Sequence, residues 1–434
     1  MRKRNLFVVA LLAMGAATFT SCNNDDALNG GIENPAESDA QQIVLQVSNS
    51  GDGMTTRGGR PLESSAPGQD LDEVKLIICN NKKQSNVVYA TVIDNWKQTS
   101  TTYVTGGHGR ETTLTLADDD KLQPGHYTVY AIGYSDNSNY SNLESDVSSI
   151  DKDDTFNEGL ALTLGDGKPA EEIFAGSLEF DVEDSKGFRE SVVLNRQVAG
   201  AFFYVDDIPA LEGASKIRLV STSKNEQLVL GKFANFDLLN NGENNTPNVN
   251  YVINGTRLET GEPHILCQIK LSEWFENPSL DNDKDGVIDI ANNNWKEDER
   301  KYKPGSVFAG NFVVPFAKTT GKNTLTLQMV KDNGEALRSW KVKLPVRDGQ
   351  TVTHSLWTWM ADNDKGFIKT PNNTDSRDTY GIVRNHLYGI GQRPSNEPDD
   401  PGTGPDVPES LDTKQTLVLR VNDNWEVIHD MDIE

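Results

Sequence analysis

The chain is a succession of short apolar runs separated by clusters of Gly, Pro, Asn and Asp, and this pattern limits its fold more than any other feature. Many of the runs alternate apolar and polar residues, which places the apolar side chains on one face of a strand. Helical periodicity is hard to find. Representative runs are Ile43–Val47, Val74–Cys79, His126–Gly133, Thr324–Val330, Leu337–Leu344 and Thr416–Val421. Many short strands with turn signals between them predict an all-β sandwich or barrel rather than alternating β/α units.

One strand shows the alternation especially clearly. A Pro124-Gly125 turn leads into a run in which Tyr127, Val129 and Ala131 share one face and the intervening residues share the other. An aromatic residue placed directly after a turn is a common device at sandwich corners. We therefore assign Tyr127 a structural role.

The N-terminus reads as an export signal. Residues 1–21 combine a basic start, an apolar run too short to span a bilayer and a small residue, Ser21, at the end. Cys22 follows directly, as in a lipoprotein cleavage box, although Phe19 stands where Leu is usual. We expect Cys22 to carry an acyl lipid such as palmitate, and residues 22–60 to begin as a polar tether. An ordinary cleaved signal peptide with an incidental cysteine is the alternative.

The length of 434 residues suggests two domains. A charged stretch at Glu183–Glu190 predicts the boundary, with one domain at 61–187 and a second at 188–392. Residues 393–410 are dense in Pro, Gly and acidic residues and should form an extended linker. The segment 411–434 is patterned as strands but is too short to fold alone, so it needs a partner sheet.

These features together resemble the Bacteroidales fimbrillins, the type V pilins, and especially their minor-fimbria shaft subunits. The resemblance spans nearly the whole chain and lies in Cys22, Thr55–Arg60, Leu122–Ala131, Ile173–Gly176, Leu194–Ala199, Val383–Tyr388 and the Pro-rich linker before Leu417–Ile433. It implies two transthyretin-like β-sandwich domains and export as a lipoprotein to the outer membrane. It also implies cleavage by an arginine-specific surface protease, and polymerisation by strand exchange with copies of itself and other pilus subunits.

The residues support strand exchange independently. Ile43, Leu45 and Val47 alternate as in a half-buried strand, and the Gly-, Ser- and Thr-rich stretch that follows is a natural site for proteolysis. Cleavage after Arg57 or Arg60 would remove this strand together with the lipid. The domain would then lack an edge strand and would expose an apolar groove with unpaired backbone groups.

The C-terminal segment offers a replacement strand. Leu417, Leu419 and Val421 alternate with outward-facing residues, and Val427 extends the apolar set. Strand addition gains affinity from main-chain hydrogen bonds and specificity from side-chain pockets. Because donor and groove lie at different places, the contact runs head to tail and builds a filament at the cell surface. The alternative is that 411–434 folds back and completes its own domain.

An acidic loop suggests a metal site. Asp281, Asp283 and Asp285 occupy alternate positions ahead of Gly286, and this spacing suits calcium, with the Val287 carbonyl and Asp289 as further ligands. The bidentate Glu of an EF-hand is missing, so we expect a calcium-type loop that stiffens an insertion. A solvated acidic turn is the alternative.

Charge and motif content narrow the function further. The formal net charge of −24 argues against nucleic acid as a partner. None of the common hydrolase, zinc-protease, thiol-redox or phosphate-loop motifs is present, so we expect no enzyme. Cys79 and Cys267 are expected as buried thiols, with a disulfide as the alternative. The competing functions are a tip adhesin, a lipid-anchored glycan-binding module and an anchor subunit of the same pilus.

Overall fold

The computed structural model describes the greater part of the chain. The described residues are 40–47, 71–81, 86–102, 110–157, 159–184, 186–230, 249–253, 256–257, 263–297, 302–315, 324–343, 355–359, 367–370, 382, 387–391, 408–412 and 416–422. Within them, strands predominate and the helices are single turns, α1 (Trp96–Thr99) and α2 (Leu271–Trp274) among them. The all-β fold class predicted from the sequence is confirmed.

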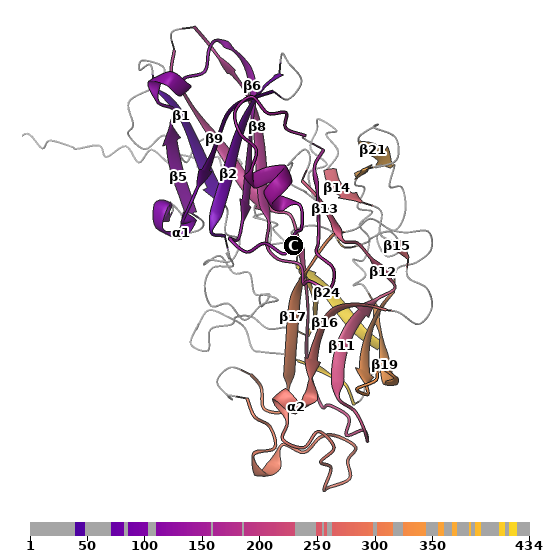
Figure 1. Ribbon diagram of the computed structural model, residues 1–434. Helices are drawn as coiled ribbons and strands as arrows, with labels where there is room; N and C mark the ends of the chain where they lie inside the picture. Colours follow the sequence, from indigo (N-terminus) through magenta and orange to yellow (C-terminus); the bar gives the residue numbers. More distant parts are fainter. Residues whose placement is uncertain are drawn as a thin grey trace, which may run out of the picture.

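The N-terminal unit is formed by β1 to β9 and folds into two packed layers (Figure 1). One layer has the strand order β3-β2-β6-β8 and the other β9-β1-β5-β4, and they join where β8 meets β9. The strands are β1 (Gln41–Val47), β2 (Glu73–Asn80), β3 (Asn86–Ile93), β4 (Thr101–Thr102), β5 (Arg110–Thr115), β6 (Gly125–Tyr134), β8 (Phe174–Val182) and β9 (Phe188–Arg196).

Alternation along the strands fills the space between these layers. Tyr127, Val129 and Ala131 of β6 lie in this apolar core together with Ile43 and Leu45 of β1. The Tyr127 hydroxyl donates a hydrogen bond to the Gln123 carbonyl at 2.8 Å, which closes the corner before the strand. The structural role expected for Tyr127 is thus observed.

The other face of β6 has two different parts. Tyr130, Ile132 and Tyr134 are buried in a second apolar cluster, beneath the segment that includes Leu143 and Phe156. Nearer the start of the strand, this face carries polar side chains instead.

The C-terminal unit is a nine-stranded sheet whose order is β16-β11-β18-β19-β24-β22-β10-β17, with β23 (Glu409–Ser410) paired to β10. Strand β10, next to β17 at the end of this order, is buried along its whole length. The strands are β10 (Ala199–Asp206), β11 (Lys216–Ser221), β16 (His264–Lys270), β17 (Val307–Val313), β18 (Leu325–Val330), β19 (Ala336–Lys343), β22 (Leu387–Ile390) and β24 (Thr416–Asn422).

Three small sheets complete the described strands. The first pairs β12 (Ser223–Lys224) with β15 (Thr256–Arg257), and the second pairs β13 (Gln227–Val229) with β7 (Ala161–Thr163). In the third, β20 (Ser355–Trp359) lies between β14 (Val249–Ile253) and β21 (Phe367–Thr370). The β7–β13 pair joins the two units, because β7 precedes β8 in the chain whereas β13 follows β11. A single apolar cluster also runs from β6 into the C-terminal unit.

The division between the units differs from the expected boundary at residue 187. β9 begins at Phe188 and pairs with β1 along its length, so it belongs to the N-terminal unit. The charged stretch at 183–190 is the connection between β8 and β9 rather than a domain linker. The strands instead change units between Arg196 and Ala199.

Candidate functional site

The strand expected to be removable, β1, lies inside a sheet. It pairs antiparallel with β5 at six positions and parallel with β9 at seven. The sequence-based expectation of an edge strand is therefore corrected: β1 has a neighbour on each side, as Figure 1 shows for the indigo strand between β5 and β9. Its removal would leave a slot bordered by two strands.

Burial of β1 is more complete than its alternation predicts. Ile43, Val44 and Leu45 are each 0% exposed. Ile43 and Leu45 pack in the core with residues such as Trp96 and Val192. Extraction of β1 would expose this apolar surface as well as the backbone groups of both neighbours.

A glutamine fixes the start of β1. The buried side chain of Gln41 donates from Nε2 to the Leu122 carbonyl at 3.0 Å, and its Oε1 accepts from the Leu122 N–H at 2.6 Å. One carboxamide thus satisfies both backbone groups of one residue. The Gln41 carbonyl also accepts from the Leu116 N–H at 3.0 Å.

Two further polar contacts line the slot. Gln46 stands opposite Glu111 of β5 and donates from Nε2 to its Oε2 at 3.2 Å. Gln42 accepts from Arg189 of β9 at 2.8 Å. Gln41, Glu111 and Arg189 were not predicted as site residues, since a glutamine in a strand carries no signal until its partner strands are known.

The proposed donor strand lies in the sheet of its own chain. β24, which contains Leu417, Leu419 and Val421, pairs parallel with β19 at three positions and antiparallel with β22 at four. In this single chain the segment therefore completes its own sheet, which is the alternative kept open by the sequence. Donation to a neighbour stays a prediction and requires β24 to leave this place. Val427 lies outside the described residues.

The processing residues also lie outside the described part of the chain. Cys22, Arg57 and Arg60 belong to segments 1–39 and 48–70, on either side of β1. Lipidation and cleavage therefore stay predictions. Among the described residues, no helix has the length and apolar character needed to cross a membrane.

The acidic loop brings three of its predicted ligands together. Carboxylate oxygens of Asp281, Asp283 and Asp285 lie within 4.8 Å of one another. Oδ1 of Asp281 is buried and has no hydrogen-bond partner among the described residues. A buried carboxylate oxygen without a donor is costly, and a cation would relieve that cost. The residues present thus fit a calcium ion.

The other two predicted ligands have a different setting. Asp289 accepts the Asn282 N–H on Oδ2 at 2.6 Å, so this carboxylate closes the loop. The Val287 N–H donates to Oδ1 of Asp285 at 2.8 Å, while Gly286 has a φ of +88° that favours glycine.

The loop is attached to the end of β10. The Ala210 N–H donates to the Gly286 carbonyl at 2.9 Å, and the Ile288 N–H donates to the Ile208 carbonyl at 2.8 Å. Asn294 holds the opposite side by donating to the Asp289 carbonyl at 2.6 Å. A rigid loop here would therefore stiffen one end of the C-terminal unit.

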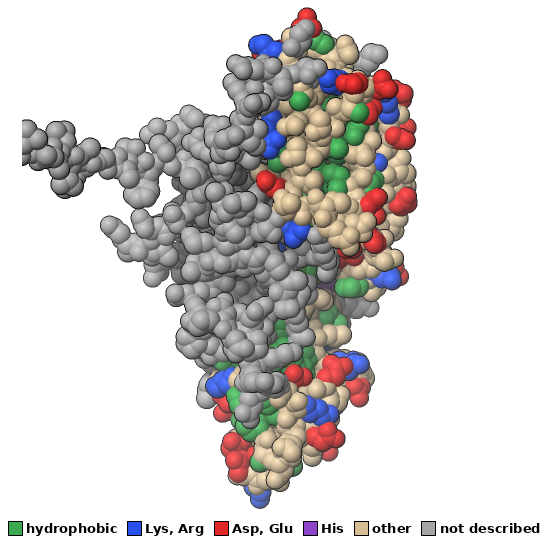
Figure 2. All heavy atoms as spheres, turned by 90° about the vertical axis from the view of Figure 1, so that its left-hand side faces the viewer, with side chains coloured by type: hydrophobic (Ala, Val, Ile, Leu, Met, Phe, Trp, Pro, Cys, Tyr) green, Lys and Arg blue, Asp and Glu red, His purple; other side chains and the backbone are tan. Residues whose placement is uncertain are grey.

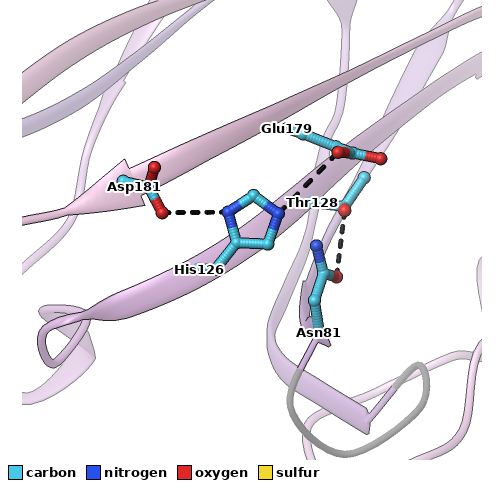
Figure 3. A network of polar contacts seen from close by, with 5 residues as sticks. All are labelled: Asn81, His126, Thr128, Glu179 and Asp181. Atoms are coloured by element: carbon cyan, nitrogen blue, oxygen red, sulfur yellow. Dashed lines mark hydrogen bonds and ion pairs between the residues drawn. The ribbon is translucent and has the colours of Figure 1, made fainter.

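A polar cluster occupies the outer face of β6 and β8 (Figure 3). Nδ1 of His126 lies 2.9 Å from Oδ1 of Asp181, and its Nε2 lies 3.7 Å from Oε2 of Glu179. Thr128 donates to Oδ1 of Asn81 at 3.0 Å. His126 is 43% exposed and both acids more so, which makes these solvent-facing cross-strand pairs rather than a catalytic site.

Acidic side chains lie on the surface, and the two described thiols are buried. In Figure 2 acidic side chains are spread along the edge of the upper unit and gather again at the lower end. Cys79 and Cys267 are both buried and are not joined in a disulfide. Burial raises the pKa of the Cys267 thiol, which keeps it protonated and unreactive.

Comparison with solved structures finds distant likenesses among fimbrial proteins. A fimbrial assembly protein from Parabacteroides distasonis is 10% identical with a TM-score of 0.35, over 81% of this chain and 90% of that protein. The fimbrial anchor protein of Porphyromonas gingivalis is 10% identical with a TM-score of 0.33, over 79% of this chain and 100% of that protein.

The tip fimbrial protein of Porphyromonas gingivalis, truncated at its C-terminus, is also 10% identical. Its TM-score is 0.35, over 81% of this chain and 94% of that protein. No protein-family model and no curated protein matches this chain. At these identities and TM-scores the likeness is distant.

Proposed function

We propose that this chain is a structural, non-enzymatic subunit of a surface pilus that supports adhesion. It is exported as a precursor, lipidated at Cys22 and held at the outer membrane. An arginine-specific surface protease then cuts after Arg57 or Arg60 and releases β1 with the lipid. The vacated slot takes the C-terminal strand of another copy, and further pilus subunits join the same chain of contacts.

The observation that carries this proposal is the place of β1. The strand is buried between β5 and β9, yet the connection that follows it contains both arginines. A cut at either arginine would separate β1 from the rest of the chain. A slot that is paired along both borders would bind an incoming strand more tightly than a sheet edge would.

Limited proteolysis tests the proposal. The purified precursor is treated with trypsin, and its size is followed by light scattering and by gels without boiling. Polymers that resist denaturant should appear only after β1 is cut away. The Arg57→Gln/Arg60→Gln double variant is the matched control and should stay monomeric. If the cleaved wild-type protein also stays monomeric, the proposal is wrong.

Calcium is proposed for the loop at 281–289. The buried Asp281 oxygen and its two neighbouring carboxylates support a bound ion, whose role would be to stiffen this end of the C-terminal unit. Calorimetry should detect heat on adding calcium to chelated protein, and chelation should lower the melting temperature. Asp281→Asn should remove both effects, whereas Asp119→Asn, in an exposed turn between β5 and β6, should retain them. No heat and no thermal shift would contradict a calcium site.

A further inference from the structure

The C-terminal segment repeats the sequence of β1. Residues 41–47 read Gln-Gln-Ile-Val-Leu-Gln-Val, and residues 415–421 read Gln-Thr-Leu-Val-Leu-Arg-Val. Glutamine stands first in both segments, Val-Leu occupies the fourth and fifth places, and valine stands last. The third place is Ile43 in one segment and Leu417 in the other. The two strands are thus alike at each position that β1 buries, namely residues 41, 43, 44 and 45, and they differ at the partly exposed positions 42 and 46.

The shared glutamine has a defined task in the slot. Gln41 satisfies both the N–H and the carbonyl of Leu122 from a buried position. When β1 is removed, both groups lose their partner, which is costly for buried backbone. In a strand aligned with β1, Gln415 would bring the same carboxamide, two residues ahead of the first core residue. A slip of one residue would instead turn every apolar side chain to the wrong face.

The one charged difference also has a counterpart. Gln46 of β1 stands opposite Glu111. Arg420 occupies the equivalent place in the C-terminal segment. A guanidinium facing a carboxylate makes a charge-assisted hydrogen bond, which is stronger than the amide contact that it replaces.

Pairing and direction favour the same transfer. In the slot, β1 pairs with β5 at six positions and with β9 at seven. In the sheet of its own chain, β24 pairs with β19 at three positions and with β22 at four. The β1 slot and the position of β24 in its own sheet each have one parallel and one antiparallel neighbouring strand. A C-terminal strand that leaves its own sheet and enters the β1 slot therefore keeps the same kind of pairing and gains paired positions.

We infer that residues 415–421 of a second copy occupy the β1 slot in one register, set at its start by Gln415 on Leu122 and near its end by Arg420 on Glu111. This inference rests on the proposed function and adds to it the residues that define the register. Glu111 and Arg420 are the specificity-determining pair, because the main-chain bonds alone do not distinguish one register from another.

Charge reversal in the full chain tests this register. Arg420→Glu and Glu111→Arg should each slow polymer formation after trypsin treatment by at least tenfold, and the double variant should recover most of the rate. Gln415→Leu should also slow polymer formation, and neither charge reversal should restore the rate. Asp423→Asn, beyond the seven matched positions, is the control and should polymerise at the wild-type rate. Melting of each uncleaved variant checks that the monomer still folds.

Cysteine pairs give a direct reading of the register. Glu111→Cys with Arg420→Cys should form a disulfide between chains after cleavage. Glu111→Cys with Leu419→Cys, one residue out of register, should not. The assigned register would be wrong, with strand exchange still intact, if the Arg420→Glu and Glu111→Arg single variants polymerised at the wild-type rate. Cross-linking only between Glu111→Cys and Leu419→Cys would also contradict this register. A wild-type chain that forms no polymer after cleavage would overturn strand exchange itself, and the register with it.

Discussion

At the scale of single residues, a buried ion pair links the last residue of β9 to the segment just before β8. Nε of Arg196 lies 2.7 Å from Oε1 of Glu172, and the side chains are 5% and 2% exposed. The guanidinium also lies over the ring of Phe174, 5.4 Å from its centre. A buried pair of this kind contributes little net stability, but removal of one partner leaves a buried charge that nothing compensates.

Glu172→Gln should therefore lower the free energy of unfolding by about 3–5 kcal/mol, because the shape is kept and the charge is lost. Denaturant titration measures the change. The control is Glu276→Gln, which breaks a pair with Lys296 whose carboxylate is 75% exposed and should cost less than about 1 kcal/mol. Equal effects of the two substitutions would contradict the role given to burial.

A histidine gives the fold a dependence on pH. Burial lowers the pKa of His264 and the charge of Lys224 lowers it further, against an opposing effect of Glu226. The folded state therefore binds fewer protons than the unfolded state below the ordinary histidine pKa of about 6.5. Stability should be lost as the pH falls through that value.

His264→Gln should remove this component of the pH dependence. The measurement is the free energy of unfolding of the wild type and the variant at pH values of about 7.5 and about 5. Both proteins are compared because carboxylates titrate in each of them and contribute equally to the two pH dependences. The wild-type chain should lose more stability than the variant over this interval. A variant with the full wild-type loss would contradict the assignment.

At the scale of elements, the position of β24 changes how a tail deletion must be interpreted. The strand lies between β19 and β22, and just before it the Leu411 carbonyl accepts a hydrogen bond from Nε1 of Trp340 at 3.0 Å. Deletion of 408–434 should open the C-terminal sheet as well as remove the donor. Loss of polymers after such a deletion would not identify the cause, which is why the register test uses substitutions.

The deletion itself makes a prediction. A chain that ends at residue 407 should unfold at a lower temperature than the full chain before any protease is added, because β19 and β22 lose the strand between them. Circular dichroism against temperature measures the shift. A chain that ends at residue 422 keeps β24 and is the matched control. An unchanged melting temperature for the shorter chain would mean that β24 contributes nothing to its own sheet.

The sequence predicted where strands occur more successfully than which strands pair with one another. Alternation located β1, β6 and β24, and a turn located the Tyr127 corner. The alternation did not show that β1 lies inside a sheet, because its pairing depends on residues distant in the sequence, such as Glu111 and Arg189. The boundary at 187 was misplaced for the same reason: a charged connection between paired strands has the composition of a linker. The three aspartates were predicted because their spacing is local.

At the scale of the whole molecule, the two units share apolar contacts. β7 of the first unit pairs with β13 of the second through Leu162 and Leu228, which are both buried. The cluster that contains them extends from β6 to β22. Two units that share a core are expected to unfold together.

Leu162→Ala should weaken that coupling. The cavity should cost about 2–5 kcal/mol, and calorimetry should show one transition in the wild type resolving into two in the variant. The control is Leu76→Ala, in the core between the layers of the N-terminal unit. It should shift the transition without dividing it. A Leu162→Ala chain with the wild-type profile would contradict coupling through this contact.

The mixed pairing of β1 has a consequence for any assembly made through its slot. A strand that repeats the pairing of β1 runs parallel to β9 and antiparallel to β5, so it has one direction in the slot. Every molecule in a row would then point the same way. Such a fibre has polarity, with a vacant slot exposed at one tip and a spare tail at the other, and its two tips would present different chemistry to whatever they touch.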